Sequence, residues 1–71
     1  MTKLGMYLAK RAINKAEVCR RTGINKTRLN ELSMKETAQL KSKELYLIAL
    51  AIQIPPAELL EELHGDLTLK S

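Results

Sequence analysis

Residues 14–32, with the sequence NKAEVCRRTGINKTRLNEL, constrain the fold of this chain more than any other segment. The pattern predicts two short helices joined by a tight turn at Gly23, because glycine freely adopts the positive φ that often ends a helix. Asn14 and Asn25 each stand where a side-chain oxygen can cap the start of a helix. The apolar positions that pack one helix against the other are Val18, Cys19, Ile24, Leu29 and Leu32. This arrangement indicates a helix-turn-helix.

The second helix of this pair has an outer face rich in hydrogen-bond donors. With the two buried leucines set aside, that face holds Lys26, Thr27, Arg28, Asn30 and Glu31. Such side chains suit base edges and phosphates, and a helix-turn-helix places its second helix in the major groove of DNA. A helix hairpin with an ordinary solvated face is the alternative. The spacing together with the donor-rich helix favours DNA binding.

Charge is distributed unevenly along the chain. The segment from Lys10 to Lys35 has a net charge of +6, whereas the segment from Gln53 to Ser71 has a net charge of −3. The first segment therefore predicts a polyanionic partner. A membrane surface is the other polyanion to consider. The chain has no long basic amphipathic helix with bulky aromatic anchors, so we expect no membrane partner.

A chain of 71 residues allows one small domain. Its single cysteine excludes an intramolecular disulfide and fits a reducing compartment. No apolar run approaches the length of a membrane span, and the first residues do not resemble a signal peptide, so a cytoplasmic location is expected. We expect a helix-turn-helix domain over residues 1–64 and a loose C-terminal tail over residues 65–71.

The hydrophobic spacing predicts an all-α fold, a compact bundle of five helices. They are expected at about residues 3–12, 15–22, 26–32, 42–52 and 56–63. Residues 33–40 have no clear period and are expected to form a loop. Ser42 is a candidate N-cap, Pro56 suits the first turn of the last helix, and Gly65 ends that helix. The short connections suit a bundle whose helices 2 and 3 form the helix-turn-helix.

The fourth expected helix contains an unusual apolar run. From Leu45 to Ile52 every residue is apolar, which is more than the single stripe that a surface helix buries. The core positions are expected to be Leu45, Ile48, Ala49 and Ile52. The positions left to point elsewhere are Tyr46, Leu47 and Leu50. Two interpretations stay open: the first and fifth helices enclose this helix completely, or its outer face is a surface for a second copy or another partner.

An enzymatic function is not expected. His64 has no neighbouring cysteine or carboxylate arranged as a catalytic triad or metal site, so the sequence indicates no catalytic residue, metal or cofactor. Cys19 stands beside Arg20 and Arg21, and such neighbouring cations make it a candidate redox sensor, since they favour the reactive thiolate. Its place in the helix contact favours an inert, buried thiol instead.

Three segments resemble the Cro/C1-type, or Xre-type, helix-turn-helix domain of phage repressors and bacterial regulators. LAKRAINKAEVCRRTGIN is similar to the end of that family's first helix and its second helix, NKTRLNEL to its recognition helix, and IALAIQIPPAELLEEL to the end of its fourth helix and its proline-started fifth. Together they cover nearly the whole chain and imply a lambda-repressor-like fold. Lys15 departs from the family's usual glutamine and favours a phosphate or guanine contact. Ala12 and Gln53 stand where glycine is frequent.

The resemblance implies roles for individual residues at a DNA surface. The residues nearest base edges would be Asn25, Lys26, Thr27 and Arg28. The residues that contact the DNA backbone would be Lys15, Asn30, Lys35, Lys41 and Lys43. The partner would be a double-stranded DNA operator. Because one recognition helix reads only a few base pairs, we expect a weak homodimer on it, paired through the spare apolar residues of the fourth helix, Tyr46, Leu47 and Leu50.

These observations favour a small sequence-specific repressor that inserts its recognition helix, about residues 26–32, into the major groove. The alternative is the antitoxin of a toxin–antitoxin pair, which binds its own operator and a toxin protein. The apolar face of the fourth helix and the acidic tail would supply that second surface. Antitoxins often carry a long extension for the toxin, and only about seven residues follow the last expected helix here. The repressor is therefore favoured.

Overall fold

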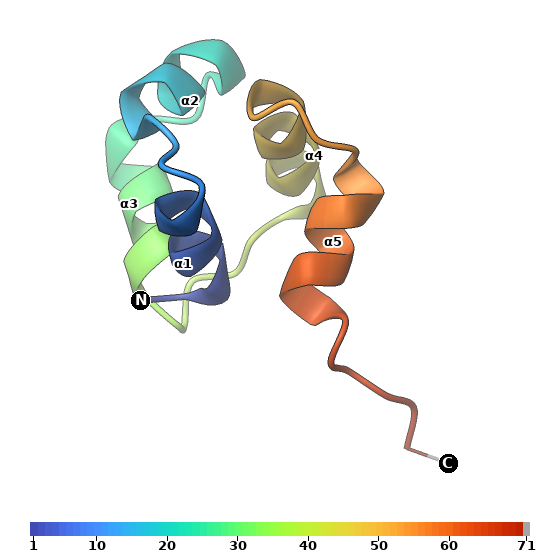
Figure 1. Ribbon diagram of the computed structural model, residues 1–71. Helices are drawn as coiled ribbons and strands as arrows, with labels where there is room; N and C mark the ends of the chain where they lie inside the picture. The colour runs from blue at the N-terminus through green and yellow to red at the C-terminus, as the bar shows by residue number, and fades with distance from the viewer. Residues whose placement is uncertain (71) are drawn as a thin grey trace.

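The computed structural model describes residues 1–70, and these residues form five helices (Figure 1). The helices are α1 (Lys3–Lys10), α2 (Lys15–Thr22), α3 (Lys26–Met34), α4 (Ser42–Ala51) and α5 (Pro56–His64). The predicted all-α fold is confirmed, and within the described residues there is no strand. The expected ends differ by at most two residues: α1 ends before Arg11, and α3 continues to Met34.

Caps at the helix-turn-helix explain where α2 and α3 begin and end. The Asn14 side chain accepts a hydrogen bond from the backbone N–H three residues later at 3.2 Å, and Asn25 does the same at 2.7 Å. Gly23 has a φ of +81°, as predicted for the turn. Such caps satisfy N–H groups that a helix start leaves unpaired. The expectation for Ser42 is wrong, because Lys41 is the extended residue before α4 and Ser42 is already helical.

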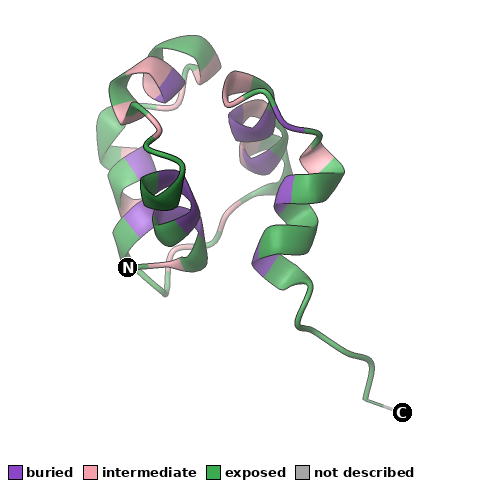
Figure 2. Ribbon diagram, viewed as in Figure 1, coloured by how far each residue is buried: buried purple, intermediate pink, exposed green. Residues whose placement is uncertain are grey.

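The core lies between the helices, and Figure 2 shows the buried residues on their inward faces. The largest of the fully buried apolar side chains come from four helices, and they are Leu8, Leu29, Ile48 and Leu59. On α4, the predicted core positions Leu45, Ile48 and Ala49 are buried, whereas Ile52 is only partly buried. The core therefore joins α1 and α3 to α4 and α5 in one cluster.

The outer face of α4 stays open. Tyr46 is 54% exposed and Leu50 is 50% exposed, while Leu47 is partly buried. The interpretation that α1 and α5 enclose α4 completely is therefore wrong. The physical reason is that α4 packs mainly against α2 and α5, which cover only the side that carries Ile48 and Ala49.

A close approach between α1 and α3 depends on Gly5. A Cβ atom at this buried glycine would lie 2.1 Å from the carbonyl oxygen of Ser33. The same oxygen accepts hydrogen bonds from the Thr2 backbone N–H at 2.9 Å and from Thr2 Oγ1 at 3.0 Å. The start of α1 is thus tied to the end of α3, and this contact positions α3. No sequence signal had pointed to Gly5.

Two residues other than glycine adopt positive φ angles. Ala12, just after α1, has a φ of 54°, and Gln53, just after α4, has a φ of 64°. Both are positions where the resemblance implied that glycine is frequent. A left-handed conformation costs about 1–2 kcal/mol for a residue with a Cβ atom. Gly65 has a φ of −64°, so the end of α5 does not require the left-handed conformation that glycine adopts easily.

After α5, residues 67–70 have no regular secondary structure and extend away from the bundle (Figure 1). Asp66 pairs with Lys3 of α1 at 2.9 Å, just before this extended segment. The domain boundary after residue 64 stays a prediction, and Ser71 lies outside the described residues. Within residues 1–70, no helix combines the length and apolarity needed to cross a membrane.

Candidate nucleic-acid interface

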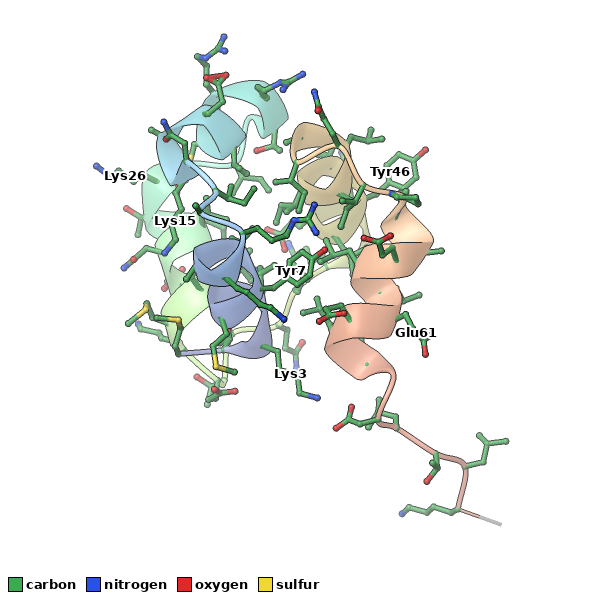
Figure 3. All side chains as sticks on the ribbon, viewed as in Figure 1. Lys3, Tyr7, Lys15, Lys26, Tyr46 and Glu61 are labelled. Carbon is green, nitrogen blue, oxygen red and sulfur yellow. The ribbon has the colours of Figure 1, made fainter. Side chains whose placement is uncertain are left out.

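A groove of about 410 Å³ opens on the outer surface of α2 and α3. Its lining residues are Lys15, Ala16, Cys19, Lys26, Thr27, Leu29 and Asn30. Figure 3 shows Lys15 and Lys26 on the same side of the molecule, opposite to Tyr46 of α4. Four of the predicted DNA contacts therefore come together at one place, and they are Lys15, Lys26, Thr27 and Asn30.

The first turn of α3 presents polar side chains to solvent. Lys26 and Thr27 are exposed, and so is Asn25 just before them. The side-chain oxygen of Asn25 caps α3, and the amide nitrogen of the same side chain takes no part in that cap. The positive end of a helix dipole and unpaired backbone N–H groups favour an anion at such a position. This end of α3 thus suits DNA phosphates and base edges.

The predicted backbone contacts outside the groove are exposed lysines. Lys35 follows α3 and pairs with Glu31 at 3.7 Å, with side chains that are 66% and 39% exposed. Exposed pairs of this kind contribute little, so the ammonium group can turn to a phosphate at small cost. Lys41 and Lys43 are exposed at the start of α4. The structure does not bring these three lysines into the groove.

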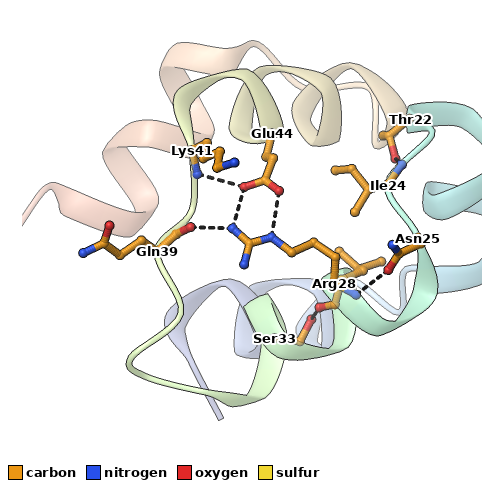
Figure 4. Close-up of polar contacts among 9 residues, drawn as sticks. Thr22, Ile24, Asn25, Arg28, Ser33, Gln39, Lys41 and Glu44 are labelled. Carbon is orange, nitrogen blue, oxygen red and sulfur yellow. Dashed lines mark hydrogen bonds and ion pairs between the residues drawn. The ribbon is translucent and has the colours of Figure 1, made fainter.

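Arg28 is directed away from the groove. Its Nε donates a hydrogen bond to Glu44 Oε2 at 2.8 Å, and its Nη2 donates to Glu44 Oε1 at 3.0 Å (Figure 4). Nη2 also donates to the Gln39 carbonyl oxygen at 2.7 Å. The expectation placed Arg28 with the base-reading residues, and the structure instead joins it to α4.

Both members of this pair are held in their charged forms. The hydrogen bond from Arg28 lowers the pKa of Glu44 below its ordinary value, despite an opposing effect of burial. The same bond raises the pKa of Arg28. Glu44 is also a local cap, because its Oε1 accepts the Lys41 backbone N–H at 2.9 Å. Sequence reasoning missed Glu44, although its place three residues after the cap of α4 is a usual capping position.

Cys19 differs from its expectation. It packs against the core but is only partly buried, and it lines the groove beside Lys15 and Lys26. The expectation of a buried thiol is therefore wrong, because one side of Cys19 forms part of the wall of the groove.

Comparison with known proteins identifies this arrangement. The family model of the Cro/C1-type HTH DNA-binding domain matches residues 3–62, from the first residue of α1 into α5. No curated protein and no solved structure matches the chain. The matched range includes both helices of the groove and every residue that lines it. The chain belongs to the family of Cro/C1-type helix-turn-helix DNA-binding domains.

Proposed function

We propose that this DNA-binding regulator is a small, sequence-specific repressor that places α3 in the major groove of its operator. The observation that carries the proposal is the groove between α2 and α3, where two lysines meet two short polar side chains. Lysine can donate to guanine O6 and N7, and threonine can contact a base edge or the thymine methyl group. This groove combines charge for the phosphates with donors for the bases.

The contacts divide by position along α3. Lys26 and Thr27, in its first turn, read bases, because this end of a recognition helix enters the groove. Asn25 adds its amide nitrogen beside them. The phosphate contacts come from Lys15, Asn30, Lys35, Lys41 and Lys43. Arg28 is absent from both groups, because Glu44 and Gln39 already bind its guanidinium group.

We further propose that two copies bind together as a weak homodimer on an inverted repeat. One recognition helix reads only a few base pairs, and a two-fold pair places its half-sites about 34 Å apart. The pairing surface is the open face of α4, with Tyr46 and Leu50 each about half exposed beside Leu47. None of these three residues lines the groove, so pairing through them leaves Lys15 and Lys26 accessible to DNA.

An antitoxin is the second candidate, and the same open face favours it. Tyr46 and Leu50 would then contact a toxin rather than another copy, while α3 still binds the operator. Co-expression with the product of an adjacent reading frame separates the two candidates. If the wild-type chain forms a stable complex with that product and Leu50→Glu does not, the result supports the antitoxin.

Selection from random DNA duplexes with the purified chain tests the proposal. We expect one enriched motif arranged as an inverted repeat. Lys26→Ala should change the preferred base at one position and cost about 1–3 kcal/mol on the selected site. A reporter gene whose promoter carries this site should then be expressed at a lower level when the chain is present. No enriched motif would contradict sequence-specific binding, and raised expression would contradict repression.

A further inference from the structure

We propose that Arg28 and Glu44 form a brace that positions the recognition helix rather than reading bases. The brace is the set of contacts that Arg28 makes with Glu44 and with the Gln39 carbonyl oxygen. It sets the angle at which α3 is presented to DNA, while Lys26 and Thr27 do the reading. This inference rests on the proposed function and assigns Arg28 a different role within it.

The brace joins two helices that otherwise share few contacts. α3 packs mainly against α1 and α2, whereas α4 packs mainly against α2 and α5. The chain between them, residues 35–41, has no helix. Arg28 crosses this space in Figure 4 and binds both the loop, at Gln39, and the first turn of α4, at Glu44. The guanidinium group therefore fixes α3, the loop and α4 to one another.

The degree of burial distinguishes the brace from the other ion pairs. The side chains of Arg28 and Glu44 are 29% and 15% exposed. In the other pairs of the described residues, Lys3–Asp66, Arg20–Glu17 and Lys35–Glu31, at least one side chain is 52% or more exposed. A forked arginine–carboxylate pair with two parallel hydrogen bonds is stronger and more directional than a surface pair.

If Arg28 turned toward DNA, its base contact would have to contribute more binding free energy than the loss of the brace costs. Turning Arg28 toward DNA removes three hydrogen bonds from its guanidinium group and leaves the mostly buried Glu44 carboxylate without its cation. Leaving one partner of a buried charge pair unpaired is strongly unfavourable. The groove, by contrast, already holds two lysines that need no such rearrangement. The geometry thus favours Arg28 as a positioning residue.

The test compares Arg28→Gln, Glu44→Gln and the double variant on duplexes that wild type has selected. Glu44→Gln keeps an acceptor for the Lys41 N–H but loses the negative charge. We expect each single variant to weaken binding by roughly two- to thirtyfold on every duplex, with the preferred sequence and the salt slope unchanged. The double variant should bind DNA no more weakly than either single variant, because each single variant already removes the same interaction. Lys26→Ala is the matched control, since it should change the preferred sequence.

The opposite role gives opposite results. If Arg28 reads bases or phosphates, Glu44→Gln frees it, so binding should tighten or stay unchanged. Arg28→Gln alone would then relax one position of the site or lower the salt slope by about one unit. Either result overturns the brace while leaving the proposed function intact. A wild-type chain that selects no duplex overturns both. Circular dichroism of each variant confirms that the helices are retained.

Discussion

The two left-handed residues that are not glycine give a sharp test of the turns that end α1 and α4. Ala12 and Gln53 have φ angles of 54° and 64°, and both are exposed. Replacing either residue with glycine therefore removes backbone strain and loses almost no packing. Gly23, with a φ of +81°, offers the reverse substitution as a control.

The expected magnitude follows from two opposing terms. Removing the Cβ atom from a left-handed position relieves about 1–2 kcal/mol. Glycine also increases the conformational entropy of the unfolded chain, which offsets about 0.4–1 kcal/mol of that gain. From the middle of these two ranges, Ala12→Gly and Gln53→Gly should each stabilise the fold by about 0.5–1 kcal/mol. For a domain of this size, that free energy raises Tm by about 2–8 °C.

Thermal melts followed by circular dichroism measure these changes directly. Gly23→Ala should lower Tm, and because a Cβ atom there meets nothing within 4 Å, its cost is backbone strain alone. Gln53→Asn should fall between wild type and Gln53→Gly, since asparagine tolerates this region better than glutamine. Glycine variants that melt at or below the wild-type Tm would show that these turns store no strain.

Three other predictions concern packing, pH and assembly. Gly5→Ala should destabilise the fold by about 1–3 kcal/mol, because its Cβ atom would press on the Ser33 carbonyl at 2.1 Å, and a denaturant titration with unchanged midpoint would refute this. Because the folded-state pKa of Glu44 is lowered, its stabilising effect is complete above the ordinary glutamate pKa of about 4.3 and is lost as pH falls through the folded-state value. The difference in stability between wild type and Glu44→Gln should therefore shrink as pH falls, and a difference that grows would contradict the assignment. Leu50→Glu should leave the helices intact and abolish pairing on DNA, as measured by sedimentation with the selected duplex, whereas loss of the circular dichroism signal would mean that Leu50 is part of the core.

Local signals in the sequence predicted most of the fold. The caps at Asn14 and Asn25 and the turn at Gly23 depend on residues within four positions of each other, so their chemistry is visible in the sequence. The periodicity of α4 likewise separated the buried Ile48 from the exposed Tyr46. Such features needed no knowledge of how the helices cross.

The features that were missed depend on contacts between distant segments. Gly5 matters because the carbonyl group of Ser33, from a different helix, lies against it. Arg28 and Glu44 are 16 positions apart, and only the folded path of the chain between α3 and α4 brings them together. On the sequence alone, an arginine in the first half of a recognition helix has the same chemistry whether it faces DNA or a neighbouring carboxylate. Spacing predicted the helix, but the direction of that side chain required the structure.

The salt dependence of binding to the selected duplex tests the central claim most directly. If Lys15, Lys35, Lys41 and Lys43 each neutralise one phosphate, the plot of log Kobs against log salt concentration should have a slope of about −3.6 for each bound chain. An alanine at any of these positions should reduce the slope by about 0.9, while Lys70→Ala, in the extended segment after α5, should leave it unchanged. A wild-type slope near zero, or alanine variants of these four lysines whose slopes equal that of wild type, would contradict DNA binding through these residues.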